Sequence, residues 1–189
     1  MSASDRWAPL TGGPTIWVVM AVEVMTFGLF LIAFAAQWGD QPIVYRASQL
    51  QLHPESALVG TGWLLTGSWT AYRAVLALER GQRATSARWL QATGWLGALF
   101  SVHKLWDYSH LEGVGLSTNS FWFTYLFLTG LHLLHVMVGA VVFLWLGRQL
   151  VGPGLGDDEL LHTQSAAVYW HLVDVVWLLL FPILYLMHP

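Results

Sequence analysis

Five segments of this chain are each long enough and apolar enough to cross a lipid bilayer as a helix. A helix rises about 1.5 Å per residue, so about 20 mostly apolar residues are needed to cross the hydrocarbon core. The expected spans are residues 15–38, 56–78, 88–111, 119–147 and 165–187. The sequence therefore predicts an all-α integral membrane bundle of five transmembrane helices, in which residues 1–189 form a single membrane domain.

The composition supports a membrane location and excludes several kinds of redox centre. Of the 189 residues, 56% are hydrophobic and 10% are charged, whereas soluble domains carry about 25% charged residues. The chain has no cysteine, which excludes disulfides, iron–sulfur clusters, covalently attached c-type haem and thiolate copper sites. The opening residues lack the pattern of a cleavable signal peptide, so we expect the first span to direct insertion.

The distribution of basic residues predicts the orientation in the membrane. Loops on the cytoplasmic side carry an excess of lysine and arginine close to the span ends. One side of the bundle receives Arg6, Arg80, Arg83, Arg88 and Arg148, with Arg73 able to extend the same way, and the other receives Arg46 and Lys104. This asymmetry predicts a cytoplasmic N-terminus and a periplasmic C-terminus.

Ionisable residues within the spans are the candidate functional residues, since such groups in a membrane must face inward and find partners. Glu23 lies roughly 12 Å into the first span, and His171 and Asp174 lie at a comparable depth in the last one. His132 and His135 project from one face of the fourth span, because residues three apart are neighbours on a helix. We expect these five residues to form an intramembrane polar core, in which Glu23, His135, His171 and Asp174 face one another.

This polar core has two interpretations. Histidines and carboxylates together are ligands for zinc or non-haem iron, and histidines on different helices can ligate haem b. Alternatively, the residues bond one another and hold the helices together, with proton handling by Glu23 as a variant. The repeated Glu-x-x-His motif of di-iron bundles is absent, and Leu133, Leu134 and Val173 offer no groups to orient a metal ligand. We therefore prefer structural pairing and expect no catalytic, cofactor-binding or metal-binding residue on this chain.

Three further features have structural explanations. At the polar end of the third span, His103 and Lys104 are four and three residues from Asp107, which predicts local pairing on the outer turn. The glycines of GTGWLLTGSW and TGWLGALFS, together with Gly139, are expected to form close-packing surfaces between helices, and the alternative at any single position is that membrane helices simply tolerate glycine. Pro182 is expected to kink the last span, because proline removes a backbone donor.

Three motifs in order resemble subunit III of the haem–copper oxidases. The stretch YWHLVDVVWLLLFPILYL resembles the closing Trp-His-x-x-Asp-x-x-Trp signature of that family, which places it on Trp170, His171, Asp174 and Trp177. TGLHLLHVMVGAVVF resembles the penultimate helix of the family, with its Gly-x-His-x-x-His run. VEVMTFGLFLIAF resembles the helix that carries a membrane-embedded glutamate, which falls on Glu23. The resemblance extends over nearly the whole chain.

Within this family, the five-helix form, LSTNSFW and LLLFPILYL most resemble the NorE-type accessory subunit of nitric oxide reductases. The subunits III of oxygen-reducing quinol and cytochrome c oxidases are the alternative. The chain lacks the first two helices of the seven-helix form. In the family those two helices form one wall of a lipid-filled cleft. The resemblance therefore implies a bound phospholipid, but this chain has only part of the site that would hold it.

The resemblance implies a non-catalytic, multi-pass subunit in the bacterial inner (cytoplasmic) membrane, which supports the stability and activity of a catalytic subunit in a respiratory electron-transport complex. It implies that this chain holds no cofactor and that haem and metal belong to the partner subunits. The expected partners are a haem-bearing catalytic subunit and membrane lipid, and no nucleic acid. A more remote alternative is a small haem b cytochrome that uses His132 or His135 with His171. A transporter is disfavoured, because the sequence shows neither inverted repeats nor broken helices.

Overall fold

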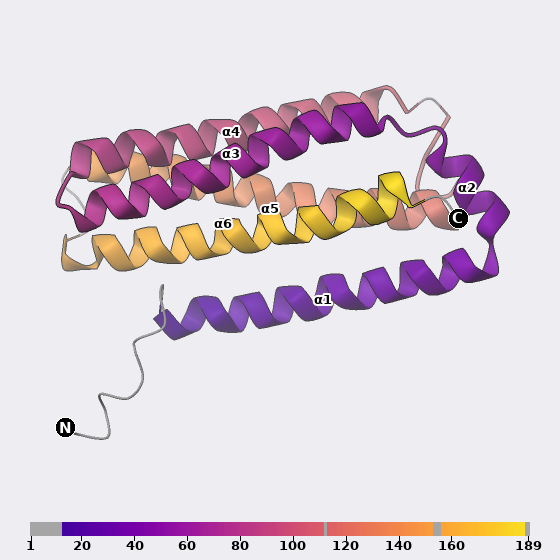
Figure 1. Cartoon of the computed structure of the whole chain (residues 1–189), viewed down its shortest axis with the longest axis horizontal. Coiled ribbons are helices and arrows are strands. Elements are labelled where there is room, and N and C mark those ends of the chain that lie inside the picture. The colour runs from indigo at the N-terminus through magenta and orange to yellow at the C-terminus, as the bar shows by residue number, and fades with distance from the viewer. Residues whose placement is uncertain (1–12, 112, 153–155, 188–189) are drawn as a thin grey trace, which may run out of the picture.

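A computed structural model describes residues 13–111, 113–152 and 156–187 (Figure 1), and every regular element in those residues is helical. This result confirms the predicted all-α fold class. The elements are α1 (Gly13–Asp40), α2 (Pro42–Gln49), α3 (Pro54–Glu79), α4 (Arg83–Ser109), α5 (Ser120–Val151), the short 3₁₀ turn η2 (Gly156–Asp158), α6 (Glu159–Phe181) and the π-helical turn η3 (Pro182–Leu186).

Local sequence signals account for where the helices begin and end. Pro42 and Pro54 occupy the first turns of α2 and α3, where the missing amide hydrogen costs nothing. The side chain of Asn119 caps α5 by accepting a hydrogen bond of 3.0 Å from the amide of Trp122. Gly81 has a φ of 73° in the turn after α3, a conformation that glycine adopts without strain. Helix α2 was not among the expected elements, because it falls in a connection that we expected to be a loop.

Three of the described helices are long and apolar enough to cross a membrane: α1, α5, and α6 together with η3. Helices α3 and α4 coincide with the other two expected spans but are more polar. Their crossing of the membrane stays a prediction, as does the orientation of the termini.

Helices α3 to α6 pack side by side, and α1 lies along the edge of this bundle (Figure 1). Only Phe27 and Phe34 of α1 are buried, while the apolar side chains of Val22, Met25 and Leu29 remain exposed. Such an apolar surface suits lipid or another membrane subunit. The short helix α2 lies at the end of the bundle to which α1 leads.

The described basic residues divide between the two ends of the helices as the sequence predicts. Arg80 and Arg83 flank the α3–α4 turn, and Arg148 lies in the last turn of α5, whereas Arg46 lies in α2 at the other end. Arg6 lies outside the described residues. Lys104 lies toward the same end as Arg46 but is buried, with 2% of its surface exposed.

Glycines from three helices enclose the side chain of Trp170 on α6. A β-carbon placed on Gly97 of α4 would lie 2.6 Å from the Trp170 ring, and one on Gly67 of α3 or Gly139 of α5 would lie 3.0 or 3.1 Å from it. A methyl group at Gly97 would force a neighbour to shift, and one at Gly67 or Gly139 would require the Trp170 ring to move by a few tenths of an ångström. The predicted close-packing role of the glycines therefore holds at these positions, whereas Gly62 has no atom near enough to need it.

Candidate functional site

Glu23 of α1 is paired with His135 of α5. Glu23 Oε1 lies 3.1 Å from His135 Nε2, and both side chains are about four-fifths buried, with 20% and 18% of their surface exposed. The other ring nitrogen, His135 Nδ1, lies 2.7 Å from the carbonyl oxygen of Leu131 one turn earlier. The ring is thus held at both nitrogens and connects α1 to α5.

These contacts determine how many protons the pair holds. The carbonyl oxygen of Leu131 only accepts hydrogen bonds, so His135 Nδ1 carries a proton and donates it. The contact between His135 Nε2 and Glu23 then needs one more proton, which belongs either to a neutral carboxyl or to a doubly protonated imidazolium. The pair is therefore either wholly neutral or a compensated ion pair, which satisfies the rule that a charge in a membrane is paired.

His132 lies one turn before His135 but faces different neighbours. Its ring stacks on Trp177 at 5.0 Å between centroids and meets the edge of Phe100 at 5.8 Å. Only 1% of its surface is exposed, and neither ring nitrogen has a hydrogen-bond partner among the described residues. Buried side-chain nitrogens without a partner are uncommon in proteins, so this residue requires an explanation.

His171 and Asp174 of α6 are directed toward α3. His171 Nδ1 lies 2.8 Å from the hydroxyl oxygen of Ser68, and the residue is exposed on the outside of the bundle. Asp174 is 5% exposed, Ser68 is its polar neighbour, and its Oδ1 has no partner among the described residues. Ser68 was not identified as a site residue from the sequence, because a lone serine in an apolar stretch carries no pattern.

The expected polar core is therefore divided. Glu23 and His135 meet at the α1–α5 contact, His171 and Asp174 lie toward α3, and His132 is enclosed between aromatic rings. The expectation that Glu23, His135, His171 and Asp174 face one another does not hold. The physical reason is the rotation of each helix about its own axis, which hydropathy leaves open.

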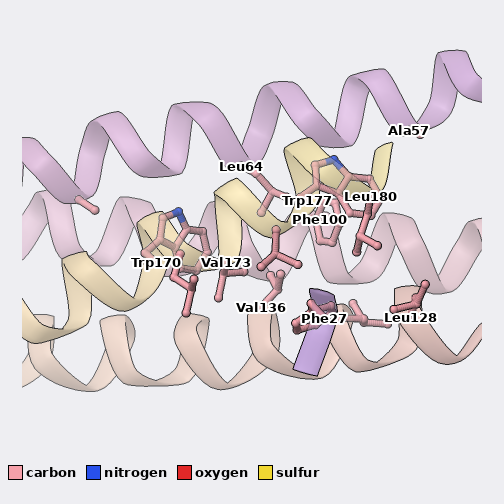
Figure 2. Packing of buried hydrophobic residues seen from close by; sticks show 14 of the residues in the cluster. Phe27, Ala57, Leu64, Phe100, Leu128, Val136, Trp170, Val173, Trp177 and Leu180 are labelled. Carbon is pink, nitrogen blue, oxygen red and sulfur yellow. The ribbon is translucent and has the colours of Figure 1, made fainter. Parts of the chain in front are cut away.

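The two tryptophans of the closing signature are structural anchors. Trp170 occupies the glycine-lined space described above, and Trp177 donates from its indole nitrogen to the hydroxyl of Thr61 on α3, at 2.8 Å. Figure 2 shows both indoles extending from α6 into the bundle, Trp177 beside Phe100. The signature Trp170, His171, Asp174 and Trp177 thus fastens α6 to its neighbours.

The sequence indicated only part of a second polar cluster, namely His103, Lys104 and Asp107. Lys104 Nζ donates to the hydroxyls of Tyr125 at 3.1 Å and Tyr185 at 2.5 Å, and these two hydroxyls lie 2.7 Å apart. Asp107 lies farther from the ammonium group, at 3.7 Å, and accepts from Ser56 of α3 at 2.7 Å. The expected local pairing on the outer turn is therefore only a minor part of a network that joins four elements.

His103 belongs to the same network rather than to a local pair with Asp107. Its Nε2 lies 3.0 Å from the hydroxyl of Ser56, which also bonds Asp107. The clustered hydroxyls beside a buried ammonium could have been suspected only from knowledge of the helix packing. A cavity of about 420 Å³ borders this network and is also lined by Trp106 and His110.

Pro182 begins a π-helical turn, and the kink expected there stays a prediction. The chain continues from α6 into a π-helical turn, closed by the amide of Met187 bonding to the carbonyl of Pro182 at 3.0 Å. The side-chain amide of Gln49 in α2 donates from Nε2 to the backbone carbonyls of Ile183 and Leu184, at 3.3 Å each. This turn directs Tyr185 toward Lys104, and α2 holds it in place.

The described residues contain no group of three or more histidine, aspartate or glutamate side chains that could hold a metal ion. The histidine pair required by the haem b alternative also does not converge. His132 is enclosed by Phe100 and Trp177, and His135 is bonded to Glu23 and Leu131. His171 bonds Ser68 on the outer surface, toward α3.

Comparison with known proteins gives a consistent family assignment. A family model described as cytochrome c oxidase subunit III matches residues 17–188. A probable quinol oxidase subunit 3 from Staphylococcus saprophyticus is 30% identical over 90% of this chain and 86% of its own length. Cytochrome c oxidase subunit 3 from Corynebacterium diphtheriae is 32% identical over 89% of this chain and 84% of its own length.

A third relative is the cytochrome bo(3) ubiquinol oxidase subunit 3 of Pseudomonas aeruginosa, which is 34% identical over 69% of this chain and 63% of its own length. All three relatives carry the names of oxidase subunits. The expected preference for a nitric oxide reductase subunit, and with it a role in denitrification, gains no support from these names. The alternative of an oxidase subunit III fits them better.

Proposed function

We propose, since this chain belongs to the cytochrome c oxidase subunit III family, that it is the non-catalytic subunit III of an oxygen-reducing cytochrome c or quinol oxidase in a bacterial membrane. The observation that carries the proposal is the family match over residues 17–188, which covers most of α1 and all of the other four long helices. In this role the chain binds a haem-bearing catalytic subunit and supports its stability and activity.

The chemistry of the chain supports a role without its own redox centre. The chain has no cysteine for a thiolate copper site. Its intramembrane histidines are occupied with Glu23, Ser68 and aromatic rings rather than arranged as a ligand set. Haem and copper, and the reaction itself, would then belong to the partner subunits.

The outer face of α1 is the surface that we expect to meet lipid or the catalytic subunit. Its side chains Val22, Met25 and Leu29 are more than half exposed. Such a large apolar face is stable only against hydrocarbon or another apolar surface. The same helix presents Glu23 toward α5, where its carboxyl group pairs with His135.

The proposal is tested by purifying the complex in mild detergent through an affinity tag on this chain. We expect haem-bearing oxidase subunits to co-purify, and the preparation to consume oxygen with a quinol or with cytochrome c as the electron donor. Comparing the two donors identifies the class of oxidase. As a control, the tagged chain expressed alone should show no haem absorption.

Two outcomes would contradict the proposal. A complex that reduces nitric oxide but not oxygen would restore the nitric oxide reductase interpretation. Stoichiometric haem absorption on the chain expressed alone would favour the small haem b cytochrome instead. Both outcomes are read from the same preparations, by gas consumption and by the Soret band.

A further inference from the structure

Arg73 lies on the outer surface of α3, beside two tryptophan rings. Its guanidinium carbon is 5.4 Å from the ring centroid of Trp69, one turn earlier on α3, and 5.4 Å from that of Trp89 on the neighbouring helix α4. The two indoles meet edge to face, with 5.3 Å between their centroids. These distances are within the range of cation–π contacts, so the two rings hold the guanidinium group at the α3–α4 surface.

The charge of this arginine has no counter-ion in the described part of the chain. Arg73 forms no ion pair with a carboxylate in residues 13–111, 113–152 or 156–187, whereas Arg83 Nη2 lies 2.6 Å from Glu159 Oε1. An arginine side chain always carries its charge, and an aromatic ring attracts a cation without having a net negative charge of its own. Because charged groups in membrane helices need partners, Arg73 requires an anion from outside these residues.

Arg73 also stands at one end of an exposed stripe on α3. Leu58, Gly62, Leu65, Trp69 and Arg73 follow one another at intervals of three or four residues, so they share one helix face, and all five are exposed. A β-carbon on Gly62 would meet no atom within 4 Å, so this part of the stripe is open. From Arg73 to Gly62 the helix rises roughly 16 Å, about half the thickness of the hydrocarbon core. The stripe therefore joins a cationic group to an apolar track as deep as one leaflet of a bilayer.

We propose that this surface binds an anionic phospholipid, whose phosphate group lies against Arg73 and whose acyl chain lies along the stripe. The planar guanidinium group donates two parallel hydrogen bonds to phosphate oxygens. The Trp69 side chain is 51% exposed, and its indole nitrogen donates to no other described residue, so it is open to the same headgroup. The inference rests on the proposed function in one respect, namely that α3 crosses the membrane.

A lipid headgroup suits this place better than a soluble anion or a carboxylate of another subunit. Tryptophan rings gather where the hydrocarbon meets the headgroups, and basic surfaces between membrane helices bind anionic headgroups. A soluble phosphate ion would gain nothing from the apolar stripe. A carboxylate of a partner subunit would have to lie at the same depth in the membrane, where such groups are rare.

The test titrates the purified complex in mild detergent with phosphatidylglycerol and counts the bound lipid molecules by native mass spectrometry. We expect the native complex to retain one phosphatidylglycerol that Arg73→Gln binds at least about tenfold more weakly, because a charge-assisted hydrogen bond is lost. The matched control is Arg46→Gln, the same change at an exposed arginine of α2, at the other end of the bundle. Equal retention by the two variants would overturn the proposal.

A second measurement separates the possible sources of the anion. We expect phosphatidylglycerol to raise the thermal unfolding temperature of the native complex more than that of Arg73→Gln. Inorganic phosphate alone and phosphatidylcholine should not produce this difference, and an equal difference with either would overturn the proposal. So would an electron cryo-microscopy map with a carboxylate of a partner subunit against Arg73. The proposed function is judged by the haem subunits that co-purify and this inference by the lipid that binds, so the failure of one is distinguishable from the failure of the other.

Discussion

The ammonium group of Lys104 lies 2.5 Å from the hydroxyl oxygen of Tyr185, so that a charge on α4 is bound by the last turn before the C-terminus. Tyr185 is placed there by the π-helical turn that begins at Pro182. Lys104 is 2% exposed, and its nearest carboxylate, on Asp107, is 3.7 Å away. The hydroxyls of Tyr125 and Tyr185 are thus the hydrogen-bond acceptors nearest to this buried ammonium group.

We expect Tyr185→Phe to destabilise the protein by about 1–3 kcal/mol, because a buried charged donor loses a partner while the packing of the ring is retained. The measurement is the thermal unfolding temperature of the purified complex. Tyr72→Phe is the control, since Tyr72 is exposed on the surface of α3. Equal unfolding temperatures for the two variants would show that Lys104 does not depend on Tyr185.

Gly97→Ala should destabilise the bundle, because the new methyl group would lie 2.6 Å from the Trp170 ring. Overpacking of this kind costs about 1–3 kcal/mol. Gly130→Ala is the matched control, since no atom lies within 4 Å of the added carbon. The double variant Gly97→Ala with Trp170→Phe should lose less stability than the sum of the two single variants, and strict additivity would contradict the steric explanation.

Glu23→Gln should leave assembly and the turnover of the complex nearly unchanged. The glutamine amide can donate to His135 Nε2, while His135 Nδ1 continues to donate to Leu131. Glu23→Ala should weaken both assembly and turnover, because it leaves a cavity and an unpaired ring nitrogen. The measurement is turnover across pH at matched assembly. Loss of turnover in the glutamine variant with normal assembly would show that Glu23 handles protons for the catalytic subunit.

Asp174→Ala should lower the thermal resistance of the complex more than Leu178→Ala. Asp174 is buried beside Ser68, whereas the Leu178 side chain is 43% exposed and leaves little empty space when shortened. Removing one member of a polar group strands the others in an apolar environment. Both variants are compared by thermal unfolding and by the yield of intact complex. Equal losses would argue that Asp174 has no partner.

The orientation predicted from the basic residues is tested with reporter fusions. A phosphatase fused after Pro189 should be active, because we expect the C-terminus to be periplasmic. The same enzyme inserted between residues 148 and 164 should be inactive, since Arg148 lies near that connection. The reverse pattern would show that the whole bundle has the opposite orientation.

The sequence alone was sufficient to predict the five long helices and the fold class. The apolar length of a segment and the turn residues at its ends are local properties, so α1, α3, α4, α5 and α6 coincide with the five expected segments to within several residues. The absence of cysteine excluded whole classes of redox centre for the same reason. The glycines were identified as packing positions because a missing side chain is visible in a sequence, although their common partner, Trp170, was not.

The tertiary structure alone decided which polar groups meet. Residues three apart on a helix differ by about 60° in direction, so His135 reaches Glu23 on α1 while His132 turns toward Phe100 and Trp177. The contact between Lys104 and Tyr185 depends on a change of helix type at Pro182, which shifts every later side chain around the axis. Hydropathy measures how apolar a helix is, but the partner of each polar group depends on the rotation of that helix, which only packing against its neighbours fixes.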